Sequence, residues 1–509
     1  MLLKKKKKKH ASWRPITAIL GFVFILAAIM LAALDYARFA NTETLYPDGL
    51  RIGGIPVGGL NRAEVEARLE SSFKIPVELD YRGARMQFAP ETFGFQLNAG
   101  QVLDAFEASS GSTLKTALWW QHLWGRTHDF ESANLDLYPT METSAIRDLI
   151  EQEIQPRYDQ KAYAPYPLLN TTYFEPGNPG WKIVNTNQAA NAIASALSSP
   201  TERRVLLDVV DLPTPELDPK ILEVALKVII QNEGFDGIVE IYTQDTSSGN
   251  VLHMAQEAYQ PILPDVAYSG ASTIKIPIAV SVLRRLNGEL PGLAEGWILQ
   301  MLTKSLNPPA DALMKTYLDE NLGPLIVTRD MQELGFQNTF LAGYFADGSP
   351  LLQRFTTPAN SRADVNLNPD TYNQTVPSEI GELLGRIYQC SIGAAADKGL
   401  FNGGVGQAAC QHLIDVMSQN RMGALIEAGL PPNQAIAHKH GWTSDTDGLL
   451  HTISDVGIIL EGEKSYVEVI FIYSPRQIIF DTGSFLVARL SQCIYNSKHI
   501  ENQTIWLGE

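Results

Sequence analysis

The S-x-x-K tetrad at residues 272–275 places the strongest constraint on how this chain of 509 residues folds. Small and polar residues precede it and an apolar run, 276–283, follows, which predicts a helix that opens at the serine. Residues three apart share a helix face, so the Lys275 amine can lie against the Ser272 hydroxyl. A serine needs such a base to become nucleophilic, and the positive end of a helix suits a developing oxyanion. The pattern predicts a serine nucleophile; its alternative is a helix cap followed by a solvent-facing lysine.

Two further polar clusters follow in order. Ser305-Leu306-Asn307 lies after an amphipathic segment and before two prolines, which predicts a polar turn between two helices. Lys439-His440-Gly441 follows the short apolar run 435–437, which predicts a strand. Together, S-x-x-K, S-x-N and K-x-G resemble the three motifs of the penicillin-recognising serine enzymes. The surroundings are most similar to class A β-lactamases and their relatives, over residues 218–509.

This resemblance implies an α+β fold of the β-lactamase/transpeptidase type for the last part of the chain. An antiparallel sheet would be flanked by helices on both faces and joined by an all-helical subdomain. The family's mechanism implies that Ser272 attacks an amide or lactam carbonyl and forms an acyl-enzyme, with Lys275 as the nearest base. A lysine ammonium cannot accept a proton, so burial or a second cation must lower its pKa.

The resemblance also assigns the remaining roles. Lys439 would supply the second cation and bind a substrate carboxylate, and Ser305 would relay a proton to the leaving nitrogen. Asn307 would hold the substrate's side-chain amide. The backbone N–H groups of Ser272 and Trp442 would form the oxyanion hole, next to Gly441.

Two positions depart from the family pattern. His440 replaces the usual Thr or Ser of the third motif, which removes a hydroxyl but leaves an imidazole that can donate a hydrogen bond. The family's E-x-x-L-N loop reads Asp364-Val365-Asn366-Leu367-Asn368 here. Asp364 is one methylene shorter than the glutamate that activates the hydrolytic water, so we expect slow deacylation, with Asn368 sharing that water. The alternative is a polar loop whose side chains only make turns.

The N-terminus predicts a membrane anchor. Six lysines at 4–9 and Arg14 precede the uncharged run 16–34, whose 19 residues approach the length that spans a bilayer. A cleaved signal has a shorter apolar region, and no good small-x-small site follows. The lysines are expected on the cytoplasmic side of a bacterial cell membrane, which leaves residues after Asp35 extracytoplasmic. Removing those seven positive charges from the net −16 leaves −23 for the remainder, which does not suit nucleic acid or anionic lipid as a partner.

The chain is too long for one core, so we expect several domains. After the segment 1–40, two small α+β units (41–128 and 129–214) precede the catalytic domain at 215–509. Their glycine-rich strand-turn-helix pattern resembles peptidoglycan-binding modules found ahead of some bacterial cell-wall enzymes; the alternative is a spacer stalk. The aromatic cluster Trp119, Trp120 and Trp124 is expected to pack between the two units rather than hold sugar.

Cysteines and histidines add two expectations. Outside the membrane, Cys390 and Cys410 could form a disulfide, with two buried thiols as the alternative. His438 and His440 are alternate residues of a predicted strand and share a face. Neither His451 nor an acidic residue has the spacing of a third metal ligand, so no metal and no cofactor are predicted.

These patterns predict a membrane-anchored extracytoplasmic serine hydrolase that forms an acyl-enzyme with β-lactams or related amides. An alternative is a D-alanyl-D-alanine peptidase or related cell-wall amidohydrolase acting on peptidoglycan stem peptides. A third is a peptidoglycan-binding protein whose catalytic domain no longer turns over. The intact serine and lysine positions disfavour the third, and the substituted glutamate favours the second over rapid β-lactam hydrolysis.

Overall fold

The computed structural model describes residues 14–40, 45–46, 48–124, 134–135, 137, 139–286, 290–394, 400 and 406–503, so the lysine run lies outside it. The chain forms two compact units. The N-terminal unit comprises Met1–Ala162 and Pro179–Pro213, and the C-terminal unit comprises Tyr163–Asn178 and Thr214–Glu509. The chain therefore passes from one unit to the other three times.

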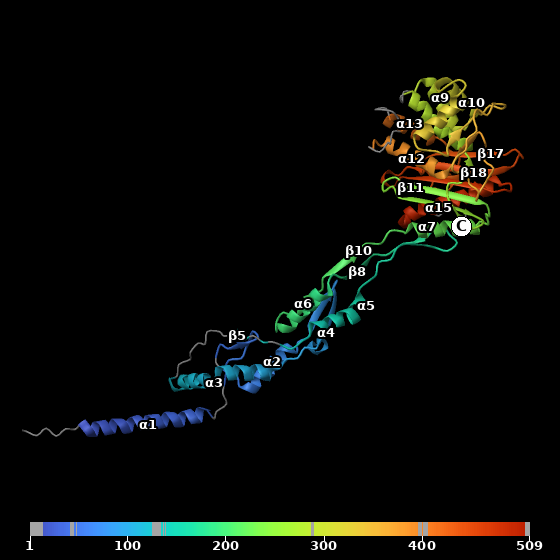
Figure 1. Ribbon diagram of the computed structural model, residues 1–509. Coiled ribbons are helices and arrows are strands. Elements are labelled where there is room, and N and C mark those ends of the chain that lie inside the picture. The colour runs from blue at the N-terminus through green and yellow to red at the C-terminus, as the bar shows by residue number, and fades with distance from the viewer. Residues whose placement is uncertain are drawn as a thin grey trace, which may run out of the picture. The chain divides into compact units, whose positions relative to one another are not determined.

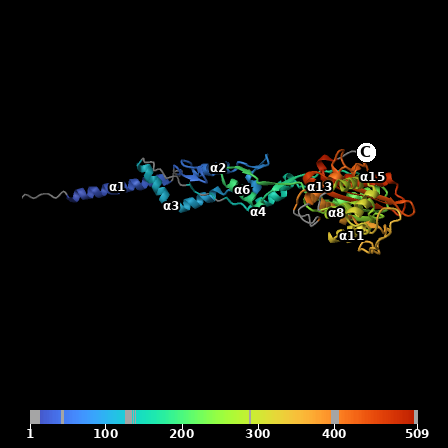
Figure 2. The same ribbon diagram turned by 90° about the horizontal axis from the view of Figure 1, so that it is seen from above.

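The first helix, α1 (Arg14–Ala40), is one unbroken helix (Figure 2). Its stretch Ala18–Ala40 is long and apolar enough to cross a membrane, and its side chains are not buried by the rest of the chain. Length and composition alone do not distinguish an anchor from a signal sequence, because both pass this test near an N-terminus.

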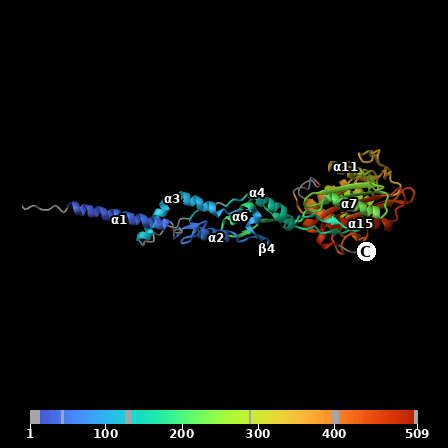
Figure 3. The ribbon, with the colours of Figure 1, turned by 90° about the horizontal axis from the view of Figure 1, so that it is seen from below.

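Short strands and helices surround one core in the N-terminal unit, with α2, α4 and α6 beside the strands (Figure 3). Its elements after α1 are β1 (Arg51–Ile52), β2 (Ile55–Pro56), α2 (Arg62–Phe73), β3 (Val77–Tyr81), β4 (Ala84–Phe88), η1 (Pro90–Phe93), α3 (Ala99–Trp124), β5 (Asn134–Leu135), α4 (Thr143–Leu149), η2 (Ile150–Ile154), α5 (Gln155–Tyr158), β8 (Gly180–Ile183), α6 (Thr186–Ser198), β9 (Arg204–Leu206) and β10 (Val209–Leu212). Helix α2 begins with a capping box: Asn61 Oδ1 accepts the Glu64 N–H at 2.9 Å, and Glu64 Oε2 accepts the Asn61 N–H at 2.9 Å.

The two modules expected at 41–128 and 129–214 share strands and a core. Strand β1 pairs in parallel with β5, and β3 pairs in parallel with β9. Buried side chains from both stretches, Leu79 and Ile193 among them, belong to the same cluster. The division at residue 128 therefore falls inside one compact unit, because two of its sheets join strands from both stretches.

A six-stranded antiparallel sheet with the order β13-β12-β11-β19-β18-β17 forms the centre of the C-terminal unit. The unit's elements are β6 (Tyr166–Pro167), β7 (Phe174–Glu175), α7 (Pro219–Asn232), β11 (Ile238–Asp245), β12 (Val251–Glu257), β13 (Gln260–Ile262), β14 (Tyr268–Ser269), η3 (Ala271–Ile274), α8 (Lys275–Arg285), α9 (Gly292–Thr303), α10 (Asn307–Tyr317), α11 (Gly323–Glu333), β15 (Phe340–Leu341), β16 (Asn373–Thr375), α12 (Pro377–Ser391), α13 (Gly406–Met417), α14 (Leu425–Ala428), β17 (Ile436–Ser444), β18 (Leu450–Ile459), η4 (Gly462–Lys464), β19 (Tyr466–Tyr473), α15 (Phe480–Lys498) and η5 (Ile500–Asn502).

Strand β19 has a nearly continuous apolar sequence and is covered on both faces. Val467, Val469 and Phe471 point into one core, whereas Ile470 and Ile472 point into another. Helices α7 and α15 lie on one side of the sheet, and α12 lies on the other, towards α9 and α10 (Figure 1). The predicted α+β class, with an antiparallel sheet between helices and a helical subdomain, is confirmed.

The hairpin 163–178 was expected within the second module, but it packs in the C-terminal unit. Phe174 is buried in the core between α7 and α15. The hydroxyl of Thr172 donates to Gln492 Oε1 at 2.9 Å, and Asn496 Nδ2 donates to the Thr172 carbonyl at 3.1 Å. The segment's own pattern carries no sign of this, because its partners lie more than 300 residues away in the chain.

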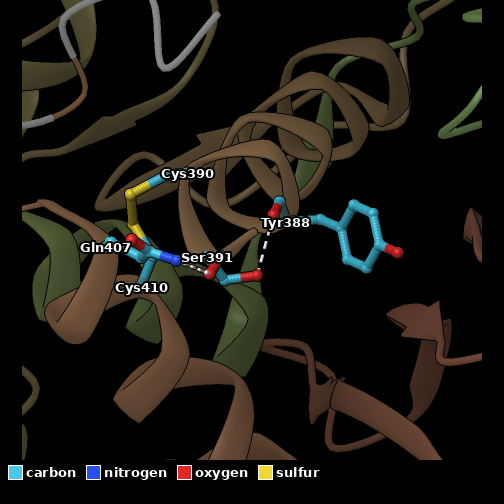
Figure 4. Close-up of a disulfide and its surroundings, with 5 residues drawn as sticks. All are labelled: Tyr388, Cys390, Ser391, Gln407 and Cys410. Atoms are coloured by element: carbon cyan, nitrogen blue, oxygen red, sulfur yellow. Dashed lines mark hydrogen bonds between the residues drawn. A yellow bond between two sulfur atoms is a disulfide. The ribbon is translucent and has the colours of Figure 1, made fainter. Parts of the chain in front are cut away.

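A disulfide joins Cys390 on α12 to Cys410 on α13 (Figure 4). Next to it, Gln407 Nε2 donates to the Ser391 carbonyl at 3.1 Å, and the Ser391 hydroxyl donates to the Tyr388 carbonyl at 2.7 Å. The bond therefore ties together two helices of the helical subdomain. Cys493 is a buried free thiol on α15.

Candidate active site

The tetrad 272–275 begins a helix, but its first turn differs from the prediction. Residues Ala271–Ile274 form the 3-10 turn η3, and the α-helix α8 starts only at Lys275. Ala271 has φ +45°, a left-handed conformation that costs energy for an alanine, so the chain enters the turn sharply. Residues three apart eclipse one another in a 3-10 turn, which brings Ser272 and Lys275 together as the α-helical pattern predicted.

The Lys275 amine makes three hydrogen bonds, and all of them lie in the predicted site. It donates to Ser272 Oγ at 3.0 Å, to the Ser305 carbonyl at 2.6 Å and to Asn307 Oδ1 at 2.8 Å. Ser305 lies in the predicted turn between α9 and α10, with φ +58°, and Asn307 is the first residue of α10. The left-handed backbone of Ser305 turns both its carbonyl and its hydroxyl towards the base and the nucleophile.

A second lysine completes a chain of hydrogen bonds to the nucleophile. Lys439 Nζ, from β17, donates to Ser305 Oγ at 2.9 Å, and Ser305 Oγ donates to Ser272 Oγ at 2.9 Å. The four side chains that the spacing predicted as catalytic (Ser272, Lys275, Ser305 and Lys439) therefore meet in one connected network. Such a network can carry a proton between the nucleophile and a leaving group.

Both lysines are fully buried, which makes their charged forms costly. Burial lowers the pKa of Lys275 to about 8, and the carboxylate of Asp311 opposes part of this shift. Burial and then the charge of Lys275 lower the pKa of Lys439 to about 7. We expected burial or a second cation to lower the pKa of Lys275, and burial is the cause.

The free edge of β17 faces the nucleophile. Strand β17 ends the sheet, and the His440 carbonyl points away from β18, since it accepts a hydrogen bond from Lys439 Nζ at 3.0 Å. Backbone groups two residues apart point to the same edge, so the Trp442 N–H lies on that edge as well. A side chain on Gly441 would bring its Cβ within 3.2 Å of the Ser272 nitrogen. Glycine therefore keeps this approach open for a substrate oxygen between two N–H donors.

His440 lies half-buried beside these cations. Its ring stacks on Trp442 with centroids 4.7 Å apart, and its Nδ1 lies 3.3 Å from Asn420 Nδ2. Burial and the charge of Lys439 lower the pKa of His440 to about 3, so the imidazole is neutral at physiological pH. It stands at the position where the family pattern has a hydroxyl.

Sequence reasoning missed several residues that support the site. Asp311, one turn after Asn307 on α10, accepts the N–H groups of Phe345 and Ala346, both at 2.9 Å. These bonds hold the Phe345 ring 5.3 Å from Lys275 Nζ, where it helps to exclude water from the base. The spacing of Asp311 from Asn307 was the one signal in the sequence, because residues four apart share a helix face.

Asp364 and Asn368 are not brought into this network. Both oxygens of the half-exposed Asp364 carboxylate accept from Arg362, at 3.0 Å from Nε and 2.6 Å from Nη2. The Arg362 guanidinium holds the pKa of Asp364 below its usual value. The Asn368 backbone has φ +50°, and its N–H donates to Asn366 Oδ1 at 2.8 Å, as in a turn. Among the described residues, no hydrogen bond links either side chain to Ser272, Lys275 or Ser305.

One group of residues outside this site has the composition of a metal site. Glu240, His253 and Asp265 bring their ligand atoms within 4.8 Å of one another. Glu240 already accepts the N–H groups of Asp265 and Val266, at 2.6 and 3.1 Å, and lies 2.8 Å from His253 Nε2. The carboxylate is thus fully engaged in holding the turn before β14, and the group has a structural role.

Comparison with known proteins agrees with this geometry. Residues 298–497 match the model of the beta-lactamase enzyme family, a segment that includes Ser305, Asn307 and Lys439 but begins after Ser272. The predicted resemblance to β-lactamases is confirmed over these residues. No curated protein matches the chain.

Solved structures with a similar fold share little sequence with this chain. One is PBP-A, with 19% identity over 56% of this chain and 98% of that chain, at a TM-score of 0.40. Another is a class A beta-lactamase from Bacteroides cellulosilyticus, with 14% identity over 56% of this chain and 100% of that chain, at a TM-score of 0.40. A third is a beta lactamase from Xanthomonas campestris pv. campestris, with 16% identity over 56% of this chain and 98% of that chain, also at 0.40.

Proposed function

We propose that the C-terminal unit is a serine hydrolase that forms an acyl-enzyme with β-lactams or related amides. The observation that carries this proposal is the hydrogen-bonded chain from Lys439 through Ser305 to Ser272, with Lys275 bonded to the same serine. A serine that contacts a buried lysine of lowered pKa has both the nucleophile and the base that acyl transfer requires.

The chemistry follows from these positions. Neutral Lys275 takes the proton of Ser272 while Oγ forms a bond to the carbonyl carbon, and the oxyanion lies between the Ser272 and Trp442 N–H groups. Collapse breaks the carbon–nitrogen bond. Ser305 gives its proton to the leaving nitrogen and recovers one from Lys439. Asn307, whose Oδ1 is bound to Lys275, keeps the base aligned and can also meet a substrate amide.

A peptidase or amidohydrolase with long-lived acyl adducts is the second candidate. The pairing of Asp364 with Arg362 favours it, because a carboxylate held by an arginine is a weak base. The substrate would then be a peptidoglycan stem peptide, with penicillin as a slowly released inhibitor.

The proposal also covers location. The apolar helix α1 serves as a single-pass anchor in the bacterial cell membrane, with the lysine run on the cytoplasmic side and both units outside. The disulfide between Cys390 and Cys410 supports this orientation, since such bonds persist in oxidising compartments. The N-terminal unit would then carry the catalytic unit towards the wall and bind peptidoglycan.

Intact-mass spectrometry of the full chain with penicillin G tests the function. We expect a covalent adduct on the wild type that persists over minutes, and none on Ser272→Ala. Adduct formation on both proteins would remove Ser272 as the nucleophile, and a wild-type adduct that is lost within milliseconds would favour β-lactam hydrolysis over the second candidate. Protease digestion of intact spheroplasts tests the orientation, since a large unit outside the membrane must be cleaved.

A further inference from the structure

A buried polar relay lies behind the third motif, on the side away from Lys439's amine. His438 is fully buried, and each of its ring nitrogens faces an acceptor. Nδ1 lies 3.0 Å from Asp455 Oδ1, and Nε2 lies 3.1 Å from the Asn420 carbonyl. Since a carboxylate and a carbonyl can only accept, both nitrogens carry hydrogen and the ring is an imidazolium.

The side chain of Asn420 extends this relay to His440. Its Nδ2 lies 3.2 Å from the His438 carbonyl and 3.3 Å from His440 Nδ1. The first partner can only accept, so the nitrogen, and not the oxygen, of the amide must point this way. The amide therefore donates to His440 Nδ1 too, which leaves the hydrogen of that ring on Nε2.

We propose that Asn420 is a positioning residue that fixes His440 as its neutral Nε2–H tautomer, so that the third motif keeps one N–H donor for an anionic group of the substrate. This rests on the proposed function of the same site. The stack on Trp442 fixes the plane of the His440 ring. The hydrogen bond to Asn420 fixes the direction in which Nδ1 points within that plane. The charged groups that act on His440 are Lys439, Lys275 and His438, which favour its neutral form, and Asp455, which opposes them.

The first test needs no substrate. The ¹⁵N shifts of labelled full-length protein identify which nitrogen of His440 carries hydrogen. We expect Nε2–H in the wild type and Nδ1–H or an imidazolium in Asn420→Asp, because a carboxylate in place of the amide must accept rather than donate. Hydrogen on Nδ1 of His440 in the wild type would overturn the proposal, and so would an unchanged tautomer in a folded Asn420→Asp.

The second test uses acylation. We expect Asn420→Asp to slow acylation by penicillin G about tenfold more than acylation by its methyl ester, since only the free carboxylate needs the Nε2–H donor. Equal slowing of both compounds would mean that Asn420 acts only on stability, which the melting temperature reports separately. If the wild type is not acylated at all, the proposed function fails, while the NMR result still decides the tautomer.

A second and independent observation concerns the end of α3. Trp119 Nε1 donates to Asp35 Oδ2 at 3.0 Å, and the Trp119 ring lies edge-on to Tyr36 at 5.3 Å. His122 lies 5.4 Å from Phe39. Asp35 is the first charged residue after the apolar run of α1, so these contacts hold α3 beside the point where that run ends (Figure 2).

The tryptophans that were expected to pack between two modules are instead mostly exposed. Trp120 and Trp124 are 52% and 67% exposed, and Leu123 between them is 44% exposed. Spaced three and four residues apart, they share one face of α3. Tryptophan is enriched where a membrane meets water, because its ring is apolar and its N–H is polar. We infer that this face of α3 lies in the headgroup region of the bilayer that α1 crosses, so that the protein contacts the membrane through two helices.

Spin labels on the full chain in phosphatidylcholine vesicles test this inference. Leu123→Cys keeps both tryptophans, Leu206→Cys labels an exposed residue on β9, and Leu26→Cys labels α1; the native cysteines are bonded or buried. We expect labels at 26 and 123, but not at 206, to be shielded from a water-soluble nickel chelate. If the label at position 26 is shielded and the label at 123 is as accessible as that at 206, α1 is an anchor but α3 does not lie in the headgroup region. If 26 is accessible, the anchor fails and the inference with it.

Discussion

Each of the two units of this protein holds a cluster of charged groups, and the two clusters lie in opposite environments. In the N-terminal unit, Arg62 joins Glu66, Asp104 and Glu107 at 2.6–3.1 Å, and all four side chains are well exposed to solvent. In the C-terminal unit, Lys275, Lys439 and the His438–Asp455 pair are fully buried. Exposed pairs are largely neutralised by water, whereas buried charges must be held by specific partners.

This difference in burial decides what each cluster of charges contributes to stability and to chemistry. The loss of a surface ion pair changes the free energy of unfolding little, so its residues can vary without consequence for the fold. A buried lysine costs stability because its charged form is desolvated, and the same desolvation lowers its pKa into the range where it can accept a proton. The two buried lysines lie at the candidate site, and the contrast can be tested one residue at a time.

The largest expected effect is the loss of acylation in Lys275→Met. Methionine fills a similar volume but cannot take the proton of Ser272, so we expect the acylation rate to fall about 10²–10⁴-fold. In the wild type, that rate should rise with pH through about 8, because the neutral form of Lys275 is populated as pH passes its pKa. Stopped-flow measurement with a chromogenic β-lactam from pH 6 to about 9.5 checks both statements.

The same variant should be more stable than the wild type. Removing a buried amine whose pKa is lowered removes the desolvation cost of its charge, so we expect the free energy of unfolding to rise by about 1–3 kcal/mol. Urea denaturation measures it. A variant that loses stability together with activity would mean that the three hydrogen bonds of Lys275 outweigh the desolvation, and the contrast between the units would weaken.

The next effect is structural and concerns Asp455→Ala. This change leaves the buried His438 without its carboxylate, and breaking a buried pair costs about 3–5 kcal/mol of stability. Burial alone would lower the pKa of His438, but the charge of Asp455 outweighs it and the pKa is raised. The loss should therefore be full below about pH 6.5 and fade as pH rises through the raised pKa. Urea denaturation at several pH values gives the profile.

Asp447→Ala is the matched control for Asp455→Ala. Asp447 bonds to His451 Nε2 at 2.9 Å, which is the same kind of pair, but its side chain is half-exposed. We expect little change in stability from this variant. Equal destabilisation by the two variants would show that burial does not decide the strength of these pairs.

A smaller loss is expected on removing the disulfide. Cys390 and Cys410 close a loop of 20 residues, and a Cys390→Ser, Cys410→Ser double variant should unfold about 3 kcal/mol more easily on the chain-entropy estimate. Because the bond lies in the helical subdomain rather than in the network of Ser272, the acylation rate of the folded variant should stay unchanged. Thermal melts with and without reductant measure the first effect, and a slower acylation would show that α12 and α13 shape the site.

Local spacing predicted the centre of the site well. Ser272 and Lys275 meet because they are three residues apart, and Ser305 and Asn307 lie in a turn that the flanking apolar segments defined. The start of the helix was misplaced by one turn, because the left-handed backbone of Ala271 has no signature in residue type. Strand β17 was expected from its apolar approach and carries Lys439 as predicted.

Contacts between distant parts of the chain were not predictable in the same way. His438 meets Asp455 because β17 and β18 pair with Lys439 opposite Val456, and a shift of one residue in this register would separate them. The hairpin 163–178 was expected within the second module, but Phe174 and Thr172 anchor it to α15 and its surroundings. Such pairings depend on the assembled sheet and core, which no single segment encodes.

The smallest effect on stability is expected from a substitution in the N-terminal unit. Arg62→Ala removes one side chain that bonds three carboxylates, more partners than Lys439 has in the catalytic network. By counting bonds alone, Arg62 would matter more. The guanidinium and its partners are all exposed, so water replaces each bond at almost no cost, and we expect no measurable shift in the melting temperature at physiological salt. The same melt at low salt should show a slight loss, because screening is weaker there. If Arg62→Ala destabilised the protein as much as Asp455→Ala, the number of ion pairs rather than their burial would govern stability, and the contrast between the two clusters would not hold.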